Sequence, residues 1–161
     1  MRKEQFVLPY FVYDDMCELN EQDADLLQQA HRAVSSAYAP YSGFHVGAAV
    51  RLANGETVTG CNIENAAYPS GLCAERVALF RAQAQYPGIA VESIAITAMS
   101  SEVDVNEPVA PCGACRQVMA EVELRYKKRL RILCRGTSGP IVAFNGVETL
   151  MPFAFDTLSK E

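Results

Sequence analysis

The chain has 161 residues, half of them hydrophobic and a fifth charged, with a formal net charge of -5. This length is sufficient for one domain that buries most of its apolar surface without disulfide or metal staples. The negative charge disfavours a nucleic-acid-binding protein, which is usually basic overall or along one face, and no apolar run approaches the roughly 20 residues of a membrane span.

Residues 1–20 form an N-terminal extension that contains the β-prone run Phe6–Tyr13, interrupted by Pro9. This run is compatible with an edge strand, an arm over a neighbouring subunit or a loose terminus. No secretory signal is evident, because the mostly apolar stretch before Asp14 is short and no small-residue cleavage pattern follows it. We therefore expect a cytoplasmic protein whose cysteines are reduced thiols.

The next segment is predicted to contain a helix and a β-hairpin. Apolar or small residues recur at helical spacing over residues 23–39, and Pro40 ends the pattern. Residues 46–61 are predicted to form the hairpin, with Asn54-Gly55 as its turn. Asn-Gly favours this structure because it readily adopts the positive φ angles of a type I′ turn.

Helices and strands alternate in the remainder of the chain. A second helix is expected from Cys73 to about Gln85, and a third after Pro111, which suits a helix start. This alternation predicts a single three-layer α/β/α domain over residues 21–161 with a mixed five-stranded sheet. The remaining elements are short buried strands at 93–98, 131–135 and 141–144, and a short helix near 147–150.

Three cysteines at two predicted helix starts indicate a metal site. Cys112 and Cys115 are three residues apart, so they share a helix face, and Cys73 opens the other helix. Zinc takes thiolate sulfur and is typically four-coordinate, so three protein ligands leave a position open to water, whose pKa zinc lowers towards about 7. We therefore predict one zinc ion per subunit, with Glu75 as the residue that transfers protons.

Arg76 follows this carboxylate in the sequence. Three thiolates on Zn²⁺ sum to about one negative charge, which weakens the ion as a Lewis acid. We expect Arg76 to offset that charge from beside the metal ligands.

Two other interpretations of the cysteines are open. A structural zinc site is normally closed by a fourth protein ligand, and Cys61 is the candidate for that position. The Cys112-to-Cys115 segment alone also matches a redox dithiol at a helix start. Both interpretations leave Glu75, two residues after Cys73, without a role.

The cysteine motifs belong to a longer series, namely Ser36–Ser42, Phe44–Ala49, Gly60–Pro69, Gly71–Arg76, Pro111–Gln117 and Leu150–Pro152. Through these segments the sequence resembles the cytidine deaminase family, in its small homotetrameric form, over about residues 37–155. The resemblance implies a five-stranded sheet in the order 2-1-3-4-5. It also implies hydrolytic deamination of cytidine and deoxycytidine to uridine and deoxyuridine, with release of ammonia, as a step of pyrimidine salvage.

The resemblance also implies a set of substrate contacts. Asn62 and Glu64 match residues that hydrogen-bond the ribose 3′-hydroxyl, which would disfavour both free cytosine and polynucleotides. Phe44 matches the aromatic residue that packs on the pyrimidine. The backbone N–H of Ala74 matches the group that holds the 2-carbonyl.

Two further aromatic residues match positions that the family inserts into the site of a neighbouring subunit. These are Tyr68 and Phe155, with Phe153 as a competitor for the second role. The resemblance therefore implies a homotetramer with sites completed across subunits. The alternatives are a deaminase of a cytosine-nucleoside analogue and a non-catalytic, zinc-stabilised binding module.

Overall fold

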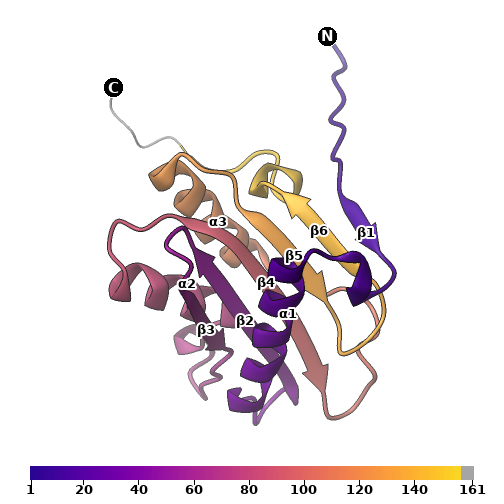
Figure 1. Cartoon of the computed structure of the whole chain (residues 1–161), viewed down its shortest axis with the longest axis vertical. Coiled ribbons are helices and arrows are strands. Elements are labelled where there is room, and N and C mark those ends of the chain that lie inside the picture. The colour runs from indigo at the N-terminus through magenta and orange to yellow at the C-terminus, as the bar shows by residue number, and fades with distance from the viewer. Residues whose placement is uncertain (157–161) are drawn as a thin grey trace.

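The computed structural model describes residues 1–156, and one mixed β-sheet forms its centre (Figure 1). The strands lie in the spatial order β1-β6-β5-β4-β2-β3. β4 and β5 pair in parallel, and the other neighbours pair antiparallel. The strands are β1 (Phe11–Tyr13), β2 (Phe44–Leu52), β3 (Thr57–Cys61), β4 (Val91–Ser100), β5 (Arg131–Arg135) and β6 (Ile141–Asn145).

Helices cover both faces of this sheet, with α1 on one face and α2 and α3 on the other (Figure 1). Within the described part of the chain, no helix is long and apolar enough to cross a membrane. The α-helices are α1 (Glu21–Ala33), α2 (Ala74–Gln85) and α3 (Gly113–Tyr126), and the 3₁₀ helices are Met16–Glu18, Val34–Ser36, Tyr68–Ser70 and Val147–Thr149.

The apolar core is divided by the sheet into two clusters. Leu133 of β5 packs with Leu27 of α1, whereas its neighbours Ile132 and Cys134 belong to the cluster that contains Leu79 of α2. This alternation follows from the two-residue period of a strand, which directs successive side chains to opposite faces. The predicted three-layer arrangement is confirmed.

The prediction of five strands is wrong by one strand. The five expected strands are β2 to β6 and lie in the implied order, and β1 is added beyond β6. Phe11 pairs with Ala143, and the hydroxyl of Tyr13 accepts a hydrogen bond from Arg131 at 3.1 Å. Of the three possibilities for the N-terminal extension, Phe11–Tyr13 adopts the edge strand.

The hairpin between β2 and β3 is present, but its turn differs from the prediction. Gly55 has a positive φ of 87° and Asn54 does not, so the turn is not type I′. The Asn54 side chain instead accepts a hydrogen bond from the N–H of Glu56. This local bond allows Asn54 to keep an ordinary backbone conformation in a longer loop.

The first helix is shorter than predicted. α1 ends at Ala33 and a 3₁₀ turn follows, after which Ala37 is extended. Tyr38 pairs with Ile63, and the N–H of Glu64 donates to the carbonyl of Tyr38 at 2.8 Å. This bridge places the segment that follows α1 beside residues 62–64, at one end of the sheet.

A buried acidic residue connects the first turn of α1 to the sheet. Asp23 is 1% exposed, and its carboxylate accepts a 2.7 Å hydrogen bond from Arg131 and lies 3.7 Å from Arg51. Asn20 caps the helix by accepting from the Asp23 N–H at 2.9 Å. Because Arg131 also contacts Tyr13, this cluster links β1 to the domain.

Candidate metal centre and substrate cleft

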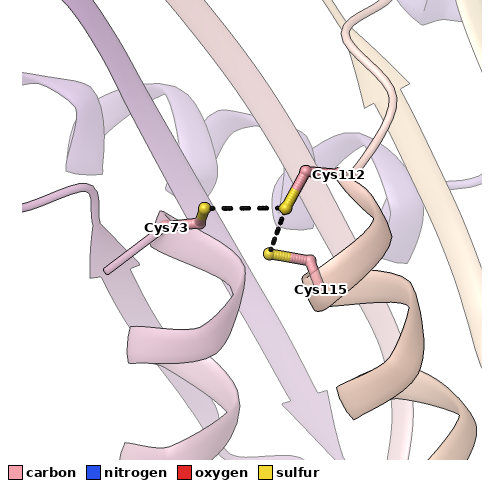
Figure 2. A group of neighbouring side chains, drawn as sticks. All are labelled: Cys73, Cys112 and Cys115. Atoms are coloured by element: carbon pink, nitrogen blue, oxygen red, sulfur yellow. Dashed lines mark hydrogen bonds between the residues drawn. The ribbon is translucent and has the colours of Figure 1, made fainter. Parts of the chain in front are cut away.

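The three predicted metal ligands meet where α2 and α3 begin. Cys73 and Cys112 are the residues that precede the first turns of these helices, and Cys115 lies within the first turn of α3. The sulfurs of Cys73 and Cys112 are 3.8 Å apart, those of Cys112 and Cys115 are 3.5 Å apart, and all three lie within 4.8 Å of one another. Figure 2 shows the three side chains pointing toward one another.

This spacing fits one zinc ion. Zinc–sulfur bonds of about 2.3 Å in a tetrahedral arrangement place two sulfurs about 3.8 Å apart. The fit also agrees with the donor chemistry, because thiolate sulfur is a preferred ligand of zinc. The three thiols therefore hold one zinc ion per subunit.

Electrostatics favour a thiolate at the first of these residues. The Cys115 thiol donates to Cys73, and this bond together with the Arg76 guanidinium lowers the pKa of Cys73 to about 5. The hydrogen bond to Cys73 in turn raises the pKa of the Cys115 thiol, and burial adds to the increase. Nη2 of Arg76 lies 3.7 Å from the Cys73 sulfur, which is the position expected for a cation that offsets thiolate charge.

Glu75 lies beside the thiols without belonging to their cluster. Its side chain is 4% exposed and lines the cleft described below. Burial raises the pKa of the Glu75 carboxyl, and the charge on Cys73 adds to the increase. A carboxyl with a raised pKa holds a proton closer to neutral pH, which suits a group that alternates between base and acid.

Close contact between β3 and α2 determines where the Cys73 and Glu75 backbone lies. A Cβ atom on Gly60 would lie 2.5 Å from the nitrogen of Ala78 and 2.8 Å from the carbonyl oxygen of Ala74. Only glycine permits this approach, because both opposing atoms belong to the backbone of α2.

Cys61 does not close the metal site. Its thiol donates to the carbonyl of Ser36 at 3.2 Å, and it is not part of the thiol cluster found among the described residues. The interpretation as a structural site with Cys61 as the fourth ligand is therefore wrong.

A cleft of about 500 Å³ opens beside the thiols. Its lining combines residues from the loop before β2, from β2, from the segment after β3 and from the starts of α2 and α3. The sequence-predicted residues that line it are Phe44, Asn62, Glu64, Tyr68, Cys73, Glu75, Arg76 and Cys112. The structure thus brings most of the expected substrate contacts together beside the metal ligands.

The predicted aromatic residue of the C-terminal segment does not line the cleft of its own chain. Phe155 is 66% exposed, and its backbone carbonyl accepts a hydrogen bond from Gln117 at 2.7 Å. Phe153 packs edge-on against Phe6, with ring centroids 5.0 Å apart. The Ala74 side chain is fully buried at the start of α2.

Sequence analysis missed Ser42 as a residue of the cleft. Its hydroxyl donates to Glu64 at 2.5 Å and accepts from the N–H of Phe44 at 3.1 Å. The available signal was its position at the end of the Ser36–Ser42 motif. That motif supported the resemblance, but no chemical role was drawn from it.

Comparison with known proteins gives consistent matches. The family model for the cytidine and deoxycytidylate deaminase zinc-binding region matches residues 20–128. The cytidine deaminase of Halalkalibacterium halodurans is 48% identical over 97 residues, which cover 60% of this chain and 69% of that protein. The cytidine deaminase of Sporosarcina psychrophila is 45% identical over 97 residues, which cover 60% of this chain and 66% of that protein.

A solved structure extends the match over most of the fold. The crystal structure of cytidine deaminase from Burkholderia pseudomallei superposes with a TM-score of 0.72 at 39% identity. The superposition covers 85% of this chain and 100% of the other.

Proposed function

Because the chain belongs to the family of cytidine and deoxycytidylate deaminases, we infer that it is a zinc-dependent enzyme that deaminates cytidine and deoxycytidine. Water is consumed, uridine or deoxyuridine is formed, and ammonia is released. The observation that carries this inference is a three-thiol metal centre with a buried carboxylate, Glu75, beside it in a cleft. Three protein ligands are typical of a catalytic zinc site rather than a structural one.

In the proposed reaction, Glu75 moves the protons. Zinc, when bound by the three thiolates, supplies a Lewis acid that makes hydroxide available near neutral pH. Glu75 accepts a proton from the attacking water and delivers it to N3 of the pyrimidine as hydroxide adds to C4. It then transfers the remaining proton to the exocyclic amine, which leaves as ammonia.

The charge of the cleft favours a nucleoside over a nucleotide. Among the residues that line it in the described part of the chain, Arg76 is the only arginine or lysine, and its guanidinium contacts Cys73. Glu64, which also lines the cleft, adds a negative charge. A 5′-phosphate would therefore find no free cation among the described lining residues, whereas the uncharged hydroxyls of a nucleoside fit the polar groups present.

Substrate binding is assigned to four groups of the chain. Asn62 and Glu64 hydrogen-bond the ribose 3′-hydroxyl, Phe44 packs on the pyrimidine, and the Ala74 N–H holds its 2-carbonyl. Free cytosine leaves the first two side chains without their hydroxyl. A hydrogen bond to a charged group contributes about 1.5 to 3 kcal/mol, and free cytosine forgoes the one to Glu64, so the base alone should be a poor substrate.

The assembly proposed is a homotetramer in which Tyr68 and Phe155 of neighbouring subunits complete each site; Tyr68 also lines the cleft of its own chain. Tyr68 is 75% exposed and Phe155 is 66% exposed, which is a large exposure for aromatic rings in a folded domain. Residues 21–161 form the catalytic domain, and residues 1–20 form an extension that supplies β1. We place the enzyme in the cytoplasm, in pyrimidine salvage, where its thiols remain reduced.

The two alternatives are not favoured. The relatives described above are cytidine deaminases, which supports cytidine itself rather than an analogue as the substrate. A non-catalytic module leaves the buried Glu75 carboxyl beside the metal centre without a role.

The assignment is tested by replacing Glu75 with Gln. The Glu75→Gln variant should retain its zinc, because the three thiols are intact, and lose at least about 10²-fold in the rate of cytidine deamination. Glu121→Gln is the matched control, because Glu121 is exposed on α3, away from the cleft. A Glu75→Gln variant that turns over cytidine at the parent rate would refute the proposed mechanism.

A further inference from the structure

The carboxylate proposed to hydrogen-bond ribose also holds the turn that precedes β2. Oε2 of Glu64 accepts from the N–H of Tyr41 at 2.9 Å and from the N–H of Ser42 at 3.3 Å. Oε1 accepts from the Ser42 hydroxyl at 2.5 Å. Three hydrogen bonds from two adjacent residues therefore fix the orientation of this carboxylate.

The neighbouring amide holds the first residues of β2 in the same way. Nδ2 of Asn62 donates to the carbonyl of Phe44 at 2.8 Å, and Oδ1 accepts from the N–H of Val46 at 2.7 Å. The backbone that carries the Phe44 ring is thus positioned from the segment that follows β3.

One hydroxyl joins these two sets of contacts. Oγ of Ser42 accepts from the N–H of Phe44 at 3.1 Å while it donates to Glu64. Ser42 is exposed and lines the cleft, so core packing does not explain a serine at this position. A hydroxyl is the smallest side chain that can accept from one group and donate to another at the same time.

We propose that Ser42 is a positioning residue for the nucleoside, with its hydroxyl fixing the Glu64 carboxylate and the Phe44 ring in one arrangement. This inference rests on the proposed deaminase function. Sugar and base are then bound by groups whose relative position is set before the substrate arrives, which lowers the entropy lost on binding. The metal ligands and Glu75 make no contact with the Ser42 hydroxyl, so the chemical step should not depend on it.

The first test compares the kinetics of Ser42→Ala and Ser42→Thr with those of the parent. Ser42→Ala removes one charge-assisted and one neutral hydrogen bond, so the KM for cytidine should rise about tenfold. The kcat should stay within about twofold of the parent and the zinc content should be unchanged. Ser42→Thr retains a hydroxyl and should restore most of the affinity. Ser101→Ala is the matched control, because its hydroxyl contacts the same turn, at the Gly43 carbonyl, without contacting Glu64 or Phe44.

A second test examines whether Ser42 acts through Glu64. If it does, the loss in kcat/KM of the Ser42→Ala, Glu64→Ala double variant should be much smaller than the product of the two single losses. A general structural defect would instead give losses that multiply. The proposal would be overturned if the losses of the two single variants multiply in the double variant. It would also be overturned if Ser42→Ala leaves the KM unchanged, or lowers kcat by as much as it raises the KM.

A third readout does not require activity. The amide of Phe44 should exchange its hydrogen faster in Ser42→Ala than in the parent, because its acceptor is removed. A parent protein that fails to deaminate cytidine would contradict the proposed function, while this exchange rate would still decide whether Ser42 fixes the Phe44 backbone. Unchanged exchange in Ser42→Ala would overturn the proposed role of the hydroxyl.

Discussion

Replacing Gly60 with Ala tests how the fold positions the metal centre. The new Cβ would lie 2.5 Å from the nitrogen of Ala78, whereas ordinary contacts begin at about 3.4 Å. The carbonyl oxygen of Ala74 would lie at 2.8 Å. Because both atoms are backbone, no side-chain rotation relieves the overlap, and α2 has to move by about 0.9 Å relative to β3.

Both stability and activity should fall in the Gly60→Ala variant. Overpacking of this kind costs about 1 to 3 kcal/mol, and a domain of this size loses about 2 to 4 °C in Tm for each kcal/mol. We therefore expect the Tm to fall by roughly 2 to 12 °C. The start of α2 carries Cys73 and Glu75, and a misplacement of about 1 Å can reduce kcat/KM by up to about 10²-fold.

The assay is thermal unfolding of the zinc-loaded protein, followed by circular dichroism, with zinc content and kcat/KM measured on the same preparation. Gly113→Ala is the matched control for stability, because a Cβ at Gly113 meets no atom within 4 Å. Its Tm should equal or slightly exceed that of the parent. A Gly60→Ala variant with the parent Tm and the parent kcat/KM would refute the argument that this contact positions α2.

Two further predictions concern a buried ion cluster and the thiols. Asp23→Asn removes the charge that pairs with Arg131, so the free energy of unfolding in urea should fall by about 1.5 to 3 kcal/mol, and an unchanged unfolding midpoint would contradict this. After zinc is removed with a chelator, iodoacetamide should alkylate Cys73 at pH 7 faster than Cys17, because the pKa of Cys73 is about 5 and that of Cys17 is raised by its bond to Asp15. The rate of Cys73 alkylation should fall as the pH decreases through 5. Mass spectrometry should find Cys134 unmodified, because it is fully buried. If bound zinc does not protect Cys73 from alkylation, the assigned ligand set is contradicted.

The metal centre could be predicted because its information is local. Two cysteines three residues apart on a helix must share a face, so the spacing of Cys112 and Cys115 predicted a common ion without any knowledge of the fold. Cys73 was grouped with them because it opens a second predicted helix and stands two residues before Glu75, although its distance from them in sequence says nothing about their separation in space. The structure confirms that the three sulfurs meet.

The contacts of the cleft could not be predicted in the same way. Helical spacing continued to residue 39, yet the backbone is extended from Ala37 because Tyr38 pairs with Ile63. This long-range pairing outweighs local helix propensity. The hydrogen bonds between Ser42 and Glu64 depend on the same pairing, since the two residues are 22 positions apart.

The sequence did not decide whether the N-terminal run forms the edge strand β1, for a related reason. A short β-prone run with a proline fits several roles, and what selects the strand is its register on β6 and the contact of Tyr13 with Arg131. These partners lie more than 100 residues further along the chain. No local pattern near Tyr13 contains that information.

The most direct test of the central claim is ammonia release from cytidine, deoxycytidine and cytosine by the purified protein, with zinc measured on the same sample. We predict one zinc per subunit, turnover of both nucleosides, and little or no turnover of the free base. Folded, fully zinc-loaded protein that releases no ammonia from either nucleoside would contradict the assignment.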